Sequence, residues 1–212
     1  MYDQMIFKPT LPFNFFNTFC GLRAKKIIIC SDIWNSPIAP ILQHLLCVWA
    51  NNNEQHYLYI IKWLAYRVQY PWLKPEVALL FINEPGAGMN IITNWLIDHI
   101  FSVKYGTTVD KIDHVTGRFN TLVENKLLCV LNEINANNNK WSYVMDIIKS
   151  LITEPKQSFE HKSTDPYDLY SYVAFIIFSN RLIPFKIDDD CRRFLLVIAI
   201  VSTVKILIIL RN

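Results

Sequence analysis

The stretch Val77-Ala78-Leu79-Leu80-Phe81-Ile82-Asn83-Glu84-Pro85-Gly86-Ala87-Gly88-Met89 carries the strongest structural signal in the chain. Its first part, residues 77–82, is a continuous apolar run, which is typical of a strand buried on both faces of a parallel sheet. Residues 83–89 contain one Pro and two Gly residues and therefore indicate a turn. A helical pattern begins near Asn90. A strand, a glycine-containing loop and a helix, in this order, build sites that hold phosphate groups.

Two more apolar runs have the same character, at residues 127–131 and 173–178. A helical spacing of apolar residues lies between them at 141–152, and two earlier helices are predicted at 37–49 and 57–68. Apolar strands that alternate with helices predict a mostly parallel sheet. The expected fold class is therefore α/β, with a mostly parallel sheet flanked by helices and a small helical N-terminal lobe.

Polar residues follow each of the three predicted strands. They are residues 83–89 after the first strand, Asn132 and Glu133 after the second, and Ser179 and Asn180 after the third. In parallel α/β sheets, ligands bind beyond the carboxyl ends of the strands. These residues are therefore expected to meet in one site.

Residues 83–90 match only part of the phosphate-binding pattern G-x-x-x-x-G-K-[ST]. The last glycine of the pattern is Gly88, and Gly86 stands beside it. Asn83 replaces the first glycine, Met89 replaces the lysine, and Asn90 stands at the Ser/Thr position. On its own, a Gly-x-Gly turn of this kind is also compatible with an ordinary loop.

The other candidates have roles that depend on a bound nucleotide. Asn132 and Glu133 are suited to hold Mg²⁺ and to polarise an attacking water, and Asn180 is suited to orient that water and sense the γ-phosphate. Arg192 and Arg193 are candidates for an arginine finger that reaches a neighbouring subunit's nucleotide. The open alternative for each residue is a plain surface or turn position.

Composition excludes several classes of protein. The chain has 212 residues and a mass of 24.9 kDa, and 52% hydrophobic with 18% charged residues exclude global disorder. The net charge of +3 is compatible with nucleic acid but does not argue for it. The five cysteines are odd in number and have no spacing typical of a zinc site. We therefore expect reduced thiols in a cytosolic or nuclear protein that is not secreted and binds no zinc.

The C-terminal stretch, residues 194–210, is apolar except for Ser202, Thr203 and Lys205. A membrane span needs about 20 apolar residues, and a central lysine costs roughly 2.5–3.5 kcal/mol there. Membrane association is therefore not expected, although a tail anchor stays open as an alternative. The favoured interpretation is a buried strand in the first half, followed by an abnormal end.

Together, several segments resemble the helicase domain of viral and mobile-element primase-helicases. These are superfamily 3 helicases of the AAA+ P-loop class, and they include the phage primase–polymerase with a fused helicase and the poxvirus-type primase-helicases. The resemblance covers most of the chain, and its dense part includes Gly117-Arg118-Phe119-Asn120 and Asp190-Cys191-Arg192-Arg193-Phe194. The matching segments, in chain order, are residues 13–21, 61–71, 117–120, 126–133, 149–155, 162–165, 175–180 and 190–194.

The resemblance implies a P-loop fold and ATP-driven unwinding of DNA by a homo-oligomeric ring. It implies ATP and Mg²⁺ as cofactors, DNA as a partner, and a primase or polymerase module that is possible on another chain. It implies phosphate or DNA contacts by Lys149 and Lys162. The implied nucleotide-binding residues are Gly86, Ala87, Gly88, Met89 and Asn90, and the implied Mg²⁺ ligands are Asn90, Asn132 and Glu133.

The departures from the family pattern fall where the chemistry takes place. Met89 cannot place a positive charge on a phosphate, and Asn83 and Glu84 add bulk and negative charge beside it. The expected function is therefore that of a degenerate helicase-like domain with weak or no ATPase. The alternatives are an active helicase in which Lys104, Lys111 or another base replaces the missing lysine, and a small membrane-anchored protein.

The predicted organisation has four parts. Residues 1–36 form an N-terminal segment, residues 37–75 the helical lobe, residues 76–201 the P-loop helicase core, and residues 202–212 an aberrant apolar tail. Family members continue past the arginine pair with polar and helical sequence. The sequence therefore predicts a truncated or frame-disrupted copy that lacks the last elements of the fold.

Overall fold

The structure is a computed structural model that describes residues 19–24, 32–84, 86–132, 138–180 and 192–199, and the side chains of these residues except 138–142. Its helices and strands are, in chain order, η1 (Ile33–Asn35), α1 (Ala39–His44), η2 (Leu45–Trp49), α2 (Glu54–Gln69), β1 (Ala78–Asn83), α3 (Met89–Trp95), η3 (Leu96–Phe101), β2 (Gly106–Val109), α4 (Asp113–Thr116), η4 (Thr121–Val123), β3 (Leu128–Leu131), α5 (Asn138–Thr153), β4 (Lys156–Phe159), β5 (Tyr167–Tyr170), β6 (Ala174–Ser179) and β7 (Phe194–Ala199).

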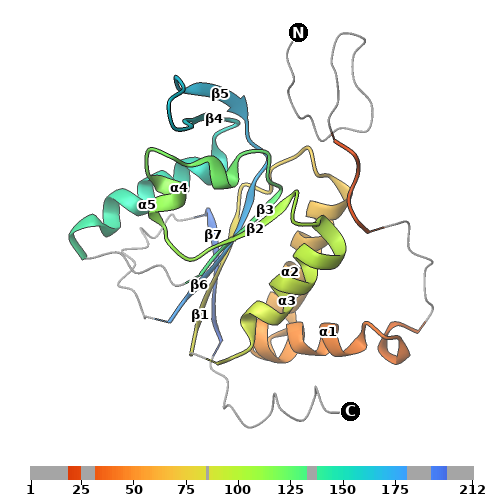
Figure 1. The fold of residues 1–212 in the computed structure, drawn as a ribbon. Helices are drawn as coiled ribbons and strands as arrows, with labels where there is room; N and C mark the ends of the chain where they lie inside the picture. Colours follow the sequence, from red (N-terminus) through yellow and green to blue (C-terminus); the bar gives the residue numbers. More distant parts are fainter. Residues whose placement is uncertain (1–18, 25–31, 85, 133–137, 181–191, 200–212) are drawn as a thin grey trace.

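Five strands form the central sheet in the order β2-β3-β6-β1-β7 (Figure 1). Every neighbouring pair in this sheet is parallel, with Leu79 of β1 opposite both Ile176 of β6 and Leu195 of β7. The predicted α/β fold with a mostly parallel sheet flanked by helices is confirmed. Because all five strands run the same way, their carboxyl ends meet at one edge of the sheet.

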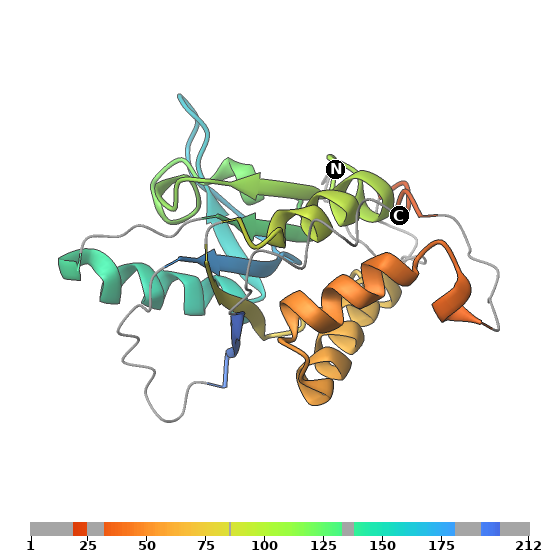
Figure 2. The same ribbon diagram turned by 90° about the horizontal axis from the view of Figure 1, so that it is seen from below.

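The helices cover both faces of the sheet (Figures 1 and 2). Leu79 and Phe81 of β1 belong to the core cluster that α1, η2, α2 and α3 share with the sheet. Ala78 and Leu80 belong to the second cluster, which lies between the sheet and α5. Side chains of a strand alternate between its faces, so one apolar run supplies both cores.

The helical segment predicted at residues 37–75 packs directly on the sheet. The indole ring of Trp49 is fully buried, and its centroid lies 4.7 Å from that of Phe81 and 5.9 Å from that of Phe178. Trp63 donates a hydrogen bond from Nε1 to the carbonyl of Val77, at 2.8 Å. These helices and the sheet therefore share one core.

Arg67 is the buried polar residue that joins the helices to the sheet. Its side chain is 0% exposed, and its guanidinium donates to the carbonyls of Leu73, Leu127 (3.3 Å) and Tyr172 (2.9 Å). Burial lowers the pKa of Arg67 to about 10, so the group stays charged at neutral pH. Leu127 and Tyr172 lie just before β3 and β6. One guanidinium therefore fixes the end of α2 against the amino ends of two central strands.

The apolar runs predicted three of the sheet strands, and two other regions were missed. The edge strand β2 is short and contains two threonines, and β4 and β5 form a separate antiparallel hairpin. The hairpin strand β4 alternates exposed and buried residues over only four positions, which is too short a pattern to stand out in the sequence.

The predicted strand at the start of residues 194–210 is confirmed as β7, but it is an edge strand and is not fully buried. Ile198 is 44% exposed, since β7 has β1 as its neighbour on one side only. Its six residues pair with β1, which contradicts a helical membrane span over this part. Within the described ranges, no helix is long and apolar enough to cross a membrane. The proposed tail, residues 202–212, lies outside the described residues.

The Arg67 contacts generate a stability prediction. Replacing Arg67 with Met fills a similar volume but leaves three buried carbonyls without their donor, which is expected to lower the free energy of unfolding by ~3 kcal/mol. The measurement is urea unfolding followed by circular dichroism. Lys62→Met, an exposed change on the same helix, is the control and is expected to change stability by less than ~0.5 kcal/mol. Equal stability of the two variants would contradict a joining role for Arg67.

Candidate functional site

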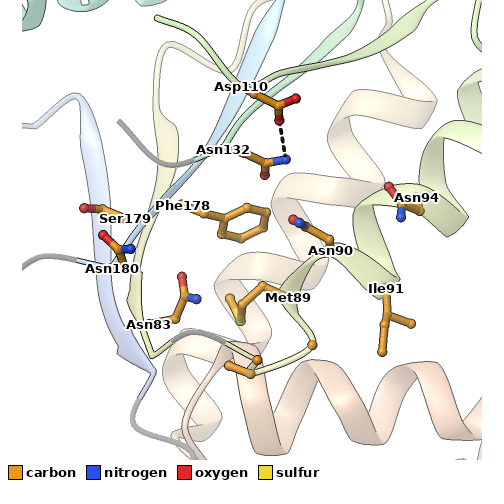
Figure 3. A pocket seen from close by; sticks show the side chains of 13 residues that line it. Asn83, Met89, Asn90, Ile91, Asn94, Asp110, Asn132, Phe178, Ser179 and Asn180 are labelled. Carbon is orange, nitrogen blue, oxygen red and sulfur yellow. Dashed lines mark hydrogen bonds between the residues drawn. The ribbon is translucent and has the colours of Figure 1, made fainter. Parts of the chain in front are cut away.

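A pocket of about 650 Å³ lies at the carboxyl ends of the strands (Figure 3). This is the edge at which the sequence placed the site. Its walls come from the loop after β1, the start of α3, and the ends of β2, β3 and β6. The lining residues are Asn83, Gly86, Ala87, Gly88, Met89, Asn90, Ile91, Asn94, Asp110, Asn132, Phe178, Ser179 and Asn180.

The structure brings most of the predicted site residues together in this pocket. The loop residues 86–90 line one side, and Asn132 and Asn180 line the side formed by the strand ends. In Figure 3 the side chains of Asn90, Asn132 and Asp110 turn toward the same part of the pocket. The predicted Glu133 lies outside the described residues.

The loop has the backbone geometry that its glycines allow. Gly86 has φ +82° and Gly88 has φ +74°, both in the left-handed region that residues with a Cβ rarely adopt. Gly88 is the N-cap of α3, and no side chain caps this end of the helix. The amide of Ala87 donates to the carbonyl of Glu84 at 3.3 Å, which closes the turn. The loop is therefore compact and leads straight into the helix.

Met89 occupies the position where a phosphate-binding lysine is expected. It is 4% exposed and belongs to the core cluster between the sheet and α1–α3, although it also borders the pocket. Asp110 is the one charged residue among the described residues that line the pocket. A site with a carboxylate and no cation disfavours a polyphosphate, because like charges repel.

His44, the last residue of α1, contacts the glycine loop at Gly88. It is 5% exposed at the end of α1, and its ring forms a hydrogen bond with the backbone of Gly88. Burial lowers the pKa of His44 below its usual value, and the bond to Gly88 opposes this shift only in part. The imidazole is therefore neutral at pH 7, so it adds no positive charge near the loop.

Asp110 was not among the residues predicted for the site, yet the structure places it in the pocket beside Asn132. Asn132 Nδ2 donates to Asp110 Oδ1 at 3.1 Å, and the Asn132 amide nitrogen donates to the Val109 carbonyl at 2.9 Å. The available signal was the short β-branched run 107–109 immediately before Asp110, which marks the end of a strand. That run was too short to be recognised without its neighbour β3.

The predicted basic residues do not reach this pocket. Arg193 lies just before β7, and its carbonyl accepts from the Ala78 amide at the amino end of β1 (2.9 Å). Arg192 is exposed at the same end. Lys149 forms an ion pair with Asp146 at 3.6 Å on α5, on the far side of the sheet. Each of these residues is therefore remote from the loop of its own chain.

Lys162 is exposed in the turn of the hairpin β4–β5, which projects from the opposite end of the molecule (Figure 1). Residues 118–124 hold this hairpin in place, so the segment that contains Gly117-Arg118-Phe119-Asn120 positions the turn. The contacts are an ion pair between Arg118 Nε and Glu160 Oε1 (2.6 Å) and hydrogen bonds from Asn120 Nδ2 to the Ser158 carbonyl (2.9 Å), from Tyr167 Oη to Glu124 Oε1 (2.9 Å) and between His161 Nε2 and Glu124 Oε2 (2.8 Å).

One aromatic ring on the hairpin and one in the segment that holds it have cations above them. Arg118 lies over the ring of Phe119 at 5.6 Å, and Lys156 lies over the ring of Tyr170 at 5.1 Å. Phe119 is 45% exposed and Tyr170 is 47% exposed. Exposed rings beside cations are the features on which single-stranded nucleic acids stack.

The chain is similar in sequence to the DNA primase-polymerase of Nitratiruptor phage NrS-1. It is 31% identical to this chain over 135 residues. The alignment covers 63% of this chain but only 18% of the phage protein, so the chain spans a small part of that protein's length.

Solved structures of the C-terminal region of NrS-1 have the same fold. An apo structure matches with a TM-score of 0.68 and 27% identity, covering 75% of this chain and 38% of the solved chain. The A form of the apo structure matches with a TM-score of 0.65 and 26% identity, covering 75% and 37%. The resemblance to the phage primase–polymerase group that the sequence indicated is confirmed.

A family model matches residues 81–193, from the first sheet strand through the pocket and the hairpin to the arginine pair. The match covers more than half of the chain. It includes the glycine loop, Asp110, Asn132 and Asn180. The chain belongs to the family of unknown function DUF5906.

Proposed function

We propose that this chain is a helicase-like domain of a viral or mobile-element replication protein, in which ATP hydrolysis is weak or lost. The ancestral activity in this proposal is ATP-driven unwinding of DNA by a homo-oligomeric ring. The likeness to the C-terminal region of the NrS-1 primase-polymerase supports a place in DNA replication. A primase or polymerase module, on this or another chain, belongs to the same proposal.

The observation that carries the proposal is the state of the pocket. A glycine loop and three polar strand ends converge there as a nucleotide site requires, but Met89 is buried at the lysine position. Asn90, Asn132 and Glu133 would hold Mg²⁺, and bound Mg²⁺ would neutralise phosphate charge. Asn180 lines the pocket at the end of β6 and would sense the γ-phosphate. The remaining site geometry therefore suits a nucleotide, while the charge balance weakens its binding.

In this proposal the arginine pair acts between subunits. Arg192 and Arg193 lie at the amino edge of the sheet, whereas the pocket lies at the carboxyl edge. They therefore cannot serve the site of their own chain. A ring in which this edge faces the neighbour's pocket would give them a role.

An active helicase is the second candidate, and Lys111 is the observation that favours it. Lys111 is exposed and directly follows Asp110 of the pocket. Lys104 is a weaker substitute, since its Nζ lies 3.7 Å from Cys20 Sγ and 5.3 Å from the centroid of the Tyr105 ring. A Lys111-dependent ATPase activity in the unmodified chain would favour this candidate over the first.

Restoring a lysine at position 89 tests the main proposal. Met89→Lys keeps an apolar stem in the core and adds an ammonium group beside the pocket, so the Kd for ATP·Mg²⁺ is expected to fall at least about tenfold, equivalent to ~1.4 kcal/mol. The measurement is equilibrium binding by calorimetry on the purified chain.

Met89→Gln is the matched control for this experiment, because it adds polarity without charge. It is expected to leave nucleotide binding as weak as in the unmodified chain. Glu133→Gln serves as a second comparison that separates binding from hydrolysis. Micromolar binding by the unmodified chain would show that Met89 is compensated and would overturn the assignment of an impaired site.

Lys162 generates a second prediction, on DNA binding. The hairpin turn presents this lysine to solvent, and Lys162→Ala is expected to weaken binding of single-stranded DNA several-fold. The slope of log K against log salt is expected to become shallower by about 0.7, the value for one lost contact to a single strand. Fluorescence anisotropy at several salt concentrations measures both quantities. Lys62→Ala on α2 is the control, and an equal loss in both variants would point to non-specific charge.

A further inference from the structure

We propose that Cys20 is a site of oxidation by peroxides, and that the ammonium group of Lys104 makes its thiol reactive. The two residues meet just before β2, at the amino edge of the sheet, whereas the pocket lies at the carboxyl edge. This site is therefore separate from the proposed nucleotide site and does not depend on it.

Cys20 and Lys104 are 84 residues apart in the sequence and in contact in the fold. Lys104 Nζ donates a hydrogen bond to Cys20 Sγ at 3.7 Å. The backbone amide of Cys20 donates to Tyr105 Oη at 3.1 Å, and the rings of Phe19 and Tyr105 pack edge-to-face with centroids 5.3 Å apart. Tyr105 is 2% exposed and is therefore a well-packed anchor. The position of the thiol thus depends on backbone and ring contacts as well as on a flexible lysine.

The surroundings of this thiol are positively charged. Lys104 Nζ lies 5.3 Å from the centroid of the Tyr105 ring, and its contacts with Tyr105, together with smaller effects of Cys20, raise the pKa of Lys104. Its ammonium group therefore stays charged at neutral pH. Lys126 Nζ donates to the carbonyls of Val103 and Lys104 at 2.9 and 3.0 Å, which brings a second lysine to the same loop. Nearby cations favour the thiolate, which is the nucleophilic form of cysteine.

Two other cysteines in the described part of the chain provide an internal comparison. Cys20 is exposed, Cys47 is half-buried, and Cys129 is 0% exposed in β3. Burial raises the pKa of the Cys129 thiol, which keeps this thiol protonated and unreactive. Exposure and thiolate character together decide which cysteines are oxidised. Among these three described cysteines, Cys20 is therefore the expected target.

The oxidation step consumes one peroxide, for which hydrogen peroxide is the simplest example. The Cys20 thiolate attacks one peroxide oxygen, so that an S–O bond forms and the O–O bond breaks. The second oxygen leaves as hydroxide. Sulfur loses two electrons and becomes a sulfenic acid, and the peroxide gains the same two electrons. The charge of Lys104 stabilises both the thiolate and the hydroxide that leaves.

The test treats the full chain with hydrogen peroxide and captures sulfenic acid with dimedone. Peptide mass spectrometry then measures the labelled fraction at each cysteine over time. Cys20 is expected to be labelled at least about tenfold faster than buried Cys129, and also faster than Cys47. Labelling of Cys20 that is no faster than that of Cys47 would overturn the proposal.

Replacing Lys104 separates activation by charge from simple exposure of the thiol. Lys104→Met removes the charge and keeps an unbranched side chain, and it is expected to slow labelling of Cys20 about threefold, the scale of an exposed ion pair. Lys104→Arg keeps the charge and is expected to restore the original rate. Lys62→Met, an exposed change on α2, is the matched control and is expected to leave the rate unchanged. Equal rates in Lys104→Met and Lys62→Met would overturn the role of Lys104.

Ionic strength gives an independent readout, because salt screens the interaction between exposed charges. The difference in labelling rate between the unmodified chain and Lys104→Met is expected to shrink as the salt concentration rises from ~0.01 M to ~1 M. A difference that salt leaves unchanged would show that the substitution acts through shape, and would overturn activation by charge. No nucleotide or DNA enters these measurements, so their failure leaves the proposed function standing.

Discussion

The buried guanidinium of Arg67 is the constraint on which the rest of the structure depends. It is enclosed between α2 and the amino ends of β3 and β6, and it donates to carbonyls from three separate parts of the chain. A buried charge costs free energy unless it is hydrogen-bonded, so the three bonds from the Nη atoms of Arg67 favour one arrangement of the helices and the two strands. The bonds from Arg67 to the residues just before β3 and β6 align the starts of these two strands, and therefore also their carboxyl ends.

The pocket follows from that arrangement. β1, β3 and β6 all run from the Arg67 side of the sheet to the pocket side, so the residues that come after them share one edge. Lys74 strengthens the same junction, since its Nζ donates to the carbonyls of Leu151 and Glu154 at the end of α5, at 2.8 and 2.6 Å. At the carboxyl edge, Asn83 Oδ1 and Asn132 Oδ1 are buried and have no hydrogen-bond partner among the described residues.

The pocket and the hairpin, at opposite ends of the molecule, differ in the charge of their side chains. The pocket contains asparagines, a carboxylate and a buried methionine, whereas the hairpin and the segment that holds it carry cations above exposed rings. In the functions proposed above, a metal ion compensates the first end and DNA contacts the second. The Gly117-Arg118-Phe119-Asn120 segment, which the sequence showed only as a family resemblance, holds the hairpin through Glu160 and Ser158. Its physical role is therefore to position a turn.

The sequence by itself determined the parallel sheet, because residues 77–82, 127–131 and 173–178 are apolar throughout and a strand buried on both faces requires this. It also determined that residues 86–90 and Asn132 lie at the strand ends, since polarity changes sharply there. Only the tertiary structure decided that Asp110 joins them, because its place depends on the pairing of β2 with β3, and four residues rich in threonine do not reveal a partner strand. The same holds for Arg67, whose helix position says nothing about carbonyls 60 and 105 residues away. Periodicity records which face of an element is buried, whereas contacts between distant segments arise only when the chain is packed.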